Sequence, residues 1–373
     1  MIYLDNAATT LQKPPAVAHA MVKALRRMST PGRGDHPPAL LAASTAFACR
    51  EEAAALFDVP NPEQVVFTGN ATHALNIAIR SLVKTGSTVL ISGYEHNAVT
   101  RLLYCMENVT VRVAHFPLFD RDAALQAFRD GLTEEVSVVI ATHVSNVFGF
   151  ILPIEGIAKL CNEKGVPFII DASQSAGCLP VSLRKLGAAF IAMPGHKGLY
   201  GPQGTGLLLC SRTAKPLLAG GTGSDSMLQE MPSYLPDRLE AGTHNMPGIA
   251  GLLEGIRFVR KMGVERIQKH EQRLLRELGS GLNNLPGTTV YMSPDPDSQI
   301  GALSFKINGR DCEELGEELA RRGIAVRSGL HCAPFAHESV GTLESGTVRV
   351  SVSAFTTTGN TKYFLKEMQN LLL

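Results

Sequence analysis

Short apolar runs rich in β-branched residues alternate with amphipathic stretches along the first 210 residues of the chain. The runs have the length and composition of buried strands, and the stretches between them have helical spacing. The predicted strands cover residues 64–68, 88–92, 109–116, 136–142, 166–171, 188–193 and 206–210. The predicted helices cover residues 73–82, 98–105, 121–130, 154–164 and 182–186. This alternation predicts an α/β domain with a mostly parallel seven-stranded sheet covered by helices.

The alternating pattern stops after the last of these strands. Residues 213–248 are rich in Gly, Pro, Ser and Thr and predict a long loop. A loop of this length is uncommon unless it is functional. A helical stretch follows over residues 249–282, and Gly263 is a candidate break within it.

A second, smaller α/β region ends the chain. It contains predicted strands at 301–307, Val326 and 347–353, and predicted helices at 312–322 and 361–371. We therefore expect a large domain over residues 16–250. Residues 1–15 and 251–373 are expected to form a small domain with it.

Composition excludes several classes of protein. The 373 residues are 45% apolar and 18% charged, which is ordinary for a globular protein. A net charge of +1 gives no electrostatic reason to bind nucleic acid or an anionic membrane, and no stretch approaches the roughly 20 apolar residues of a membrane span. The N-terminus lacks a basic region followed by an apolar core, so we expect no signal peptide. The seven scattered cysteines contain no CxxC pair, so we expect free thiols and a cytoplasmic protein.

The first candidate chemistry is a lysine paired with an aspartate. Lys197 follows the predicted strand 188–193 in a glycine-rich turn, and Asp171 closes the apolar run 166–170. A pyridoxal 5'-phosphate (PLP) site needs a lysine for the Schiff base and an aspartate for the pyridine nitrogen. A solvated lysine and an Asx-turn aspartate are the alternatives. The small and aromatic neighbours of Lys197 are unusual for a surface lysine.

Other polar residues follow neighbouring predicted strands. Thr72, His96, Asn146 and Gln174 come after four of them, and the carboxyl ends of parallel strands meet at one edge, where ligands bind. Thr72 stands at a helix start, a position that favours a phosphate, although it could be only a helix cap. His96 could be a loop histidine with its hydrogen bonds satisfied.

A second cluster lies in the C-terminal region. Cys332 is in the polar, glycine-containing loop 327–334, where a thiol beside a histidine can be a nucleophile. The alternative for a lone cysteine is a small buried hydrophobe, which we expect for Cys161, Cys178 and Cys210. Arg349 lies in an alternating strand. It could grip a carboxylate, or it could be a solvent-facing strand residue.

Together these motifs resemble those of the class V, fold-type I PLP-dependent enzymes. Within that class the chain resembles the cysteine desulfurase and selenocysteine lyase family, and is closest to its type II (SUF-like) group. The resemblance covers nearly the whole chain. Its motifs are Tyr3-Leu4-Asp5-Asn6-Ala7-Ala8-Thr9-Thr10, Glu95-His96, His143-Val144-Ser145-Asn146, Asp171-Ala172-Ser173-Gln174, Gly195-His196-Lys197, Tyr200-Gly201-Pro202, Glu240-Ala241-Gly242-Thr243 and Arg327-Ser328-Gly329-Leu330-His331-Cys332-Ala333.

The resemblance implies roles around the cofactor ring. Lys197 would be the Schiff-base lysine and proton shuttle. Asp171 would pair with the pyridine nitrogen and Gln174 with the ring hydroxyl. His96 would stack on the ring face and assist proton transfer.

The resemblance also implies phosphate and substrate ligands. Thr72 and His196 would hold the phosphate of the cofactor, and Ala71 would be a further cofactor-binding residue. Asn146 would contact the ring hydroxyl region and the substrate carboxylate, which Arg349 would clamp.

Two residues imply partners. Thr243 would reach the phosphate bound by a neighbouring subunit, so a homodimer with shared sites is expected. Cys332 would receive sulfur as a persulfide and pass it to a protein acceptor. The pathway stays open among iron–sulfur cluster assembly, thio-modified tRNA and selenium supply.

The implied reaction converts L-cysteine to L-alanine. A selenocysteine lyase acting on L-selenocysteine and a class V aminotransferase without sulfur transfer are the enzymatic alternatives. A sulfur-relay or binding protein with a vestigial site is the non-enzymatic one.

The chain departs from the family pattern at two positions. Pro194 replaces the serine whose hydroxyl commonly binds the phosphate, and proline offers no N–H in its place. Leu330 replaces a histidine often found in the cysteine loop.

Overall fold

Seven strands form the central sheet of the computed structural model, which describes residues 1–32 and 34–372. The strands follow the order β2-β8-β7-β6-β5-β3-β4. β8 is antiparallel to both of its neighbours, and all the other pairs are parallel. Their bounds are β2 Val65–Thr68, β3 Thr88–Ser92, β4 Thr110–Ala114, β5 Val136–Thr142, β6 Phe168–Asp171, β7 Phe190–Pro194 and β8 Gly206–Cys210. The predicted fold class, a mostly parallel seven-stranded sheet, is confirmed.

Both faces of this sheet are apolar. Val138 and Ile140 of β5 belong to one hydrophobic cluster, whereas Val139 and Ala141 belong to another on the opposite face. Helices cover both faces, which explains why the strands are continuous apolar runs. The helices between the strands are α3 Ala71–Leu82, α4 Asn97–Tyr104, α5 Arg121–Gly131, α6 Ile154–Glu163 and α7 Leu183–Leu186.

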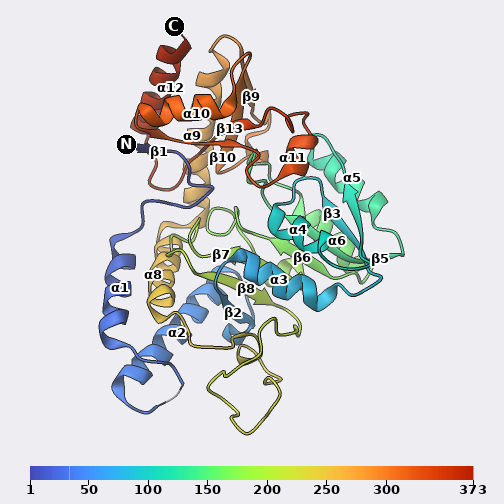
Figure 1. Cartoon of the computed structure of the whole chain (residues 1–373), viewed down its shortest axis with the longest axis vertical. Helices are drawn as coiled ribbons and strands as arrows, with labels where there is room; N and C mark the ends of the chain where they lie inside the picture. Colours follow the sequence, from blue (N-terminus) through green and yellow to red (C-terminus); the bar gives the residue numbers. More distant parts are fainter. Residues whose placement is uncertain (33, 373) are drawn as a thin grey trace.

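Two N-terminal helices were not predicted. α1 (Pro15–Arg27) and α2 (Pro37–Leu56) both pack against α8 (Met246–Met262), as Figure 1 shows. The buried face of α2 consists mainly of alanines, so its sequence carries no strong apolar stripe. The predicted break at Gly263 is confirmed, because α8 ends at Met262 and α9 (Val264–Asn283) begins directly after it.

The C-terminal region builds an antiparallel four-stranded sheet in the order β12-β13-β10-β9. Its strands are β9 Thr288–Tyr291, β10 Ala302–Ile307, β12 Arg327–Gly329 and β13 Thr347–Ser351, and its helices are α9, α10 Cys312–Arg321, α11 Pro334–Glu338 and α12 Thr358–Leu372. The predicted strand at Val326 is wrong. Val326 separates β12 from β11 (Ile324–Ala325), which pairs with a different strand. The half-exposed β9 was missed because it has no apolar run.

The N-terminus of the chain lies beside this C-terminal sheet (Figure 1). β1 (Ile2–Tyr3) pairs in parallel with β11, and Asp5 forms a parallel bridge with Ser351. The division at residues 15/16 and 250/251 stays a prediction. The long loop between β8 and α8 is irregular apart from one short 3-10 turn, Asp237–Leu239.

None of the helices among residues 1–32 and 34–372 is both long enough and apolar enough to cross a membrane.

Gly149 sits where the loop after β5 meets the C-terminal sheet. Its φ is +68°, and a Cβ there would collide with the carbonyl oxygens of Ile300 and Ala302. Its own carbonyl accepts from the N–H of Ile300 at 2.9 Å. Only glycine fits both the conformation and the close approach of the backbone.

Gly149→Ala is therefore expected to lower the free energy of unfolding by about 2–4 kcal/mol. Gly165→Ala is the matched control, because Gly165 has a φ of +66° but nothing within 4 Å of its Cβ position. It should cost only about 1 kcal/mol, the conformational part alone. Urea unfolding of both variants measures the difference. Equal losses would show that the two carbonyl groups do not constrain Gly149.

Candidate active site

A cavity of about 210 Å³ opens at the carboxyl ends of the parallel strands. Nine residues predicted for the site line it: Ala71, Thr72, His96, Asn146, Asp171, Gln174, His196, Lys197 and Arg349. Within the described residues, two predicted positions, Cys332 and Thr243, do not line this cavity. The chain thus brings most of the predicted side chains together, from five strand ends and from β13 of the other sheet.

Lys197 stands in a turn fixed by main-chain hydrogen bonds. The N–H of Gly195 bonds the carbonyl of Thr205 at 2.8 Å, and the N–H of Tyr200 bonds the carbonyl of Lys197 at 2.9 Å. The pKa of the Lys197 amine is lowered to about 8, mainly by burial; Asp171 opposes this shift and Arg349 contributes to it. The side chain lines the cavity, so it is not a solvated surface lysine. A lowered pKa supplies the neutral amine that imine chemistry requires.

Asp171 ends β6 and is 3% exposed. Its Oδ1 accepts from the N–H of Ser173 at 2.9 Å, so the predicted Asx turn is present. Within the described residues no hydrogen bond is assigned to Oδ2. The turn and a cofactor contact are therefore compatible, because the carboxylate has a second oxygen.

His96 caps the start of α4. Its Nδ1 accepts from the N–H of Ala98 at 3.0 Å, so the proton of the neutral ring is on Nε2. Burial lowers the pKa of His96, and Lys197 adds to this shift while Asp171 opposes it. The cap fixes one ring nitrogen and leaves a neutral imidazole in the cavity wall.

The start of α3 forms the end of the cavity suited to a phosphate. Asn70, not Thr72, is the N-cap, because its Oδ1 accepts from the N–H of His73 at 2.8 Å. The cap-only interpretation of Thr72 is therefore wrong. Ala71 and Thr72 lie in the first turn, whose N–H groups lack intrahelical acceptors. Pro194 also lines this cavity and offers no donor.

His196 is held by the N-terminal segment. Its Nδ1 is 3.0 Å from Oγ1 of Thr9, and burial lowers its pKa to about 4. Its carbonyl oxygen accepts from the N–H of Thr10 at 3.1 Å and from Nζ of Lys13 at 2.8 Å. Burial lowers the pKa of Lys13 to about 8. The residue before Lys197 is thus fixed to the first 13 residues of the chain.

Arg349 is 1% exposed, so the solvent-facing alternative is wrong. Its Nη1 donates to the carbonyl of Asn146 at 2.7 Å, and its Nη2 donates to Oδ1 of Asp5 at 2.8 Å. The Nδ2 of Asn146 donates in turn to the carbonyl of His331 at 2.7 Å. The arginine and the cysteine loop therefore share Asn146 as a support.

Cys332 is exposed and lies directly after His331, a residue of the cavity wall. His331 and Cys332 have φ values of +50° and +58°, two consecutive left-handed residues without the freedom of glycine. The N–H of Asn97 bonds the carbonyl of Cys332 at 2.8 Å, and Nη2 of Arg327 lies 3.9 Å from its Sγ. Cys161, Cys178 and Cys210 are buried, as expected.

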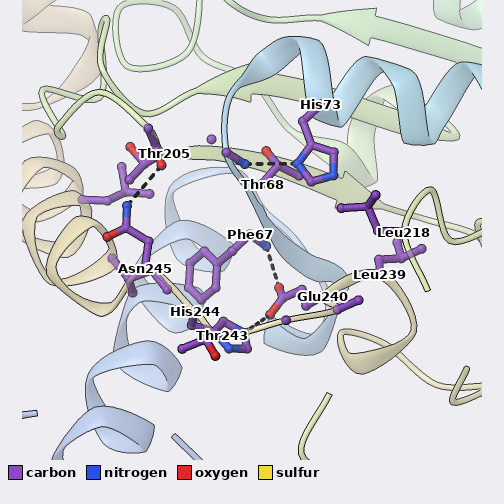
Figure 2. Close-up of a pocket in the computed structure, with 17 residues that line it drawn as sticks. Phe67, Thr68, His73, Thr205, Leu218, Leu239, Glu240, Thr243, His244 and Asn245 are labelled. Atoms are coloured by element: carbon purple, nitrogen blue, oxygen red, sulfur yellow. Dashed lines mark hydrogen bonds and ion pairs between the residues drawn. The ribbon is translucent and has the colours of Figure 1, made fainter. Parts of the chain in front are cut away.

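Thr243 lies in a second cavity of about 270 Å³, shown in Figure 2. Glu240 anchors this region. Its carboxylate accepts from Arg50 at 2.8 and 2.6 Å, from the N–H of Phe67 at 2.6 Å, and lies 2.6 Å from Nε2 of His244. Although larger, this cavity has no lysine or aspartate among its described lining residues. A role for Thr243 at the phosphate of a neighbouring subunit stays a prediction.

Three charged residues that line or support the site were not assigned a role from the sequence. Arg327 lines the cavity and is the cross-strand neighbour of Arg349. Its position in the cysteine-loop motif, residues 327–333, could have marked Arg327 as a site residue. Asp5 lies in the quoted N-terminal motif, whereas Lys13 has no local feature that would mark it.

Comparisons with known proteins place the chain in one family. The profile of the aminotransferase class-V family matches residues 2–364. A probable cysteine desulfurase of Methanothermobacter thermautotrophicus is 34% identical, over 95% of this chain and 91% of the relative. Another from Pyrococcus abyssi is 30% identical, over 100% and 94%. The apo structure of a cysteine desulfurase from Thermococcus onnurineus is similar with a TM-score of 0.89 and 30% identity, covering 100% of this chain and 94% of that one.

The lowered pKa of Lys197 predicts an amine that becomes reactive near pH 8. Below that pH the amine is protonated, and above it the neutral nucleophile predominates. The rate of reductive capture of PLP by Lys197, mapped by peptide mass spectrometry, should rise with a midpoint near 8. Surface lysines in the same digest are internal controls, and their capture should rise with midpoints at about pH 10.4. If the midpoint for Lys197 matches that of the surface lysines, burial does not lower the pKa of Lys197.

Proposed function

We propose that this protein is a cysteine desulfurase. The chain belongs to the aminotransferase class-V family, whose members use PLP. It would convert L-cysteine to L-alanine and keep the sulfur as a persulfide on Cys332. One observation carries the proposal beyond the family. The exposed thiol of Cys332 is in a loop attached to the cavity that contains Lys197 and Asp171.

The residues of the cavity fit PLP chemically. They offer an amine of lowered pKa, a buried carboxylate, a neutral imidazole and a helix N-terminus. Lys197 would form the Schiff base, Asp171 would pair with the pyridine nitrogen, and Gln174 with the ring hydroxyl. His96 would stack on the ring. When bound, PLP supplies the electron sink for reactions at the α-carbon of an amino acid.

The phosphate would lie at the first turn of α3. The N–H groups of Ala71 and Thr72 and the ring of His196 are the proposed ligands on this side. Pro194 removes the hydroxyl contact common in the family. We infer that the helix N-terminus carries a larger share of the phosphate binding here.

The chain's own groups would then act on the substrate. Arg349 and Asn146 orient its carboxylate, and the neutral amine of Lys197 takes the α-proton. The thiolate of Cys332 forms a sulfur–sulfur bond as the carbon–sulfur bond breaks. The electron pair of the broken bond stays with the carbon skeleton, which is released as alanine after protonation. Nη2 of Arg327 lies 3.9 Å from the sulfur of Cys332, so a cation stands beside the proposed nucleophile.

Partners follow from the same assignment. The exposed persulfide would be passed to an acceptor protein, in iron–sulfur cluster assembly or another sulfur pathway. A homodimer would place Thr243 of each subunit at the phosphate of the other.

Cys332→Ala tests the sulfur chemistry. The variant should retain the absorbance of bound PLP but lose desulfuration of L-cysteine by at least about 100-fold, because the nucleophile is missing. Cys105→Ala is the matched control, since Cys105 is also an exposed free thiol but lies at the end of α4. Mass spectrometry of the parent protein should find the added sulfur atom on Cys332. Undiminished desulfuration by Cys332→Ala would overturn the assignment.

Mixed dimers test the shared site. Lys197→Ala and Thr243→Ala are each expected to be impaired as homodimers. If Thr243 acts across the interface, a mixed dimer has one site with both changes and one fully intact site. Unfolding and refolding the two variants together should therefore restore activity above either parent. If Thr243 acts within its own subunit, neither site is intact and no recovery occurs.

A further inference from the structure

The guanidinium of Arg349 is fixed from two sides by the chain itself. Asn146 provides a carbonyl oxygen at 2.7 Å, and Asp5 provides a carboxylate oxygen at 2.8 Å. A guanidinium has five N–H donors, so these two bonds leave donors free for a further anion. Arg349 lines the cavity, whereas Asp5 is not among the described residues that line it. Asp5 therefore contacts the guanidinium from outside the cavity.

Asp5 keeps this position through its main chain rather than through the ion pair. It forms a bridge with Ser351, two residues beyond Arg349 on the same strand. The N–H of Ser351 bonds the carbonyl of Leu4 at 2.7 Å, and the N–H of Ala7 bonds Oγ of Ser351 at 2.9 Å. The side chain of Asn6 adds a bond to the carbonyl of Ser351 at 2.9 Å. The carboxylate is thus held in register with the arginine by strand-like pairing.

The cations around Arg349 make the carboxylate of Asp5 important. Arg327 is its cross-strand neighbour and also lines the cavity, as does Lys197. A buried guanidinium without a counter-ion is costly, and two nearby cations would push it away. Among the described residues, Asp5 is the carboxylate that bonds Arg349. It stabilises the buried guanidinium and fixes its direction.

We propose that Asp5 is the positioning residue that aims Arg349 at the substrate carboxylate, so that selectivity for an α-carboxylate depends on the N-terminal segment. The inference rests on the proposed function in one respect, the assignment of Arg349 as the carboxylate ligand. The competing explanation is that Asp5 only attaches the N-terminus to the C-terminal sheet. That explanation predicts a loss of stability with unchanged selectivity.

Binding of two ligands that contain no sulfur separates these explanations. L-alanine and L-alaninamide differ only at the carboxylate, and their binding to the PLP-loaded protein is measured by the change in cofactor absorbance. The parent protein should prefer L-alanine. Asp5→Ala should reduce this preference by about tenfold or more, while the affinity for L-alaninamide changes by less than about twofold. Asp5→Asn keeps the shape and an acceptor but loses the charge, so its preference should be intermediate.

Asn6→Ala is the matched control. It removes one attachment of the N-terminal segment to Ser351 without touching Arg349. It should lower the melting temperature and leave the ligand preference unchanged. If Asp5→Ala and Asn6→Ala lower the melting temperature alike and both retain the preference, the positioning role is overturned. If Asp5→Ala does not fold, Asp5→Asn decides, and an unchanged preference overturns the proposal.

Failure of the proposed function would look different. Arg349→Ala that still prefers L-alanine would disprove the carboxylate role of the arginine itself. Desulfuration that does not need Cys332 would disprove the sulfur chemistry, yet it would leave the ligand preference and the Asp5 result standing.

Discussion

The hydrogen bonds that attach the N-terminal segment both to β13 and to the turn of Lys197 are the constraint on which the site depends. On one side the segment pairs with β13 through Ser351, next to Arg349. On the other side Thr10 and Lys13 bond the carbonyl of His196, directly before the lysine of the cavity. Arg349 and Lys197 belong to different sheets, since Arg349 is in β13 and Lys197 follows β7. These hydrogen bonds fix the two relative to each other.

Burial then determines the protonation of the ionisable groups in the site. The same desolvation that lowers the pKa of Lys197 also keeps the imidazole of His96 neutral. Arg349 stays charged in the same surroundings, because a guanidinium keeps its proton in proteins, and Asp5 stabilises this buried cation. A site with several potential cations can therefore contain a neutral base and a permanent cation close together. The residue types separate these roles, because a buried amine or imidazole can lose its proton whereas a guanidinium cannot.

The sequence predicted those elements whose ends are marked by local residue patterns. The strands Val136–Thr142 and Gly206–Cys210 were predicted to the residue, because apolar runs and turn residues mark their ends. α2 was missed because alanines bury a helix face without an apolar stripe. The cavity residues follow strand ends and could be named in advance. Asp5 and Lys13 could not be given partners, since their contacts lie 344 and 183 residues away and only the folded backbone brings them there.

The ion pair between Asp5 and Arg349 also has a consequence for the order of assembly. Its two ends are separated by nearly the full length of the 373-residue chain. During synthesis the large sheet, with Lys197 and Asp171, can form while β13 is still absent. Such a partial chain would already hold the lysine and the aspartate but not Arg349. The ion pair of Asp5 with Arg349 is therefore among the last contacts that the growing chain can form, because a contact of such high sequence separation closes late.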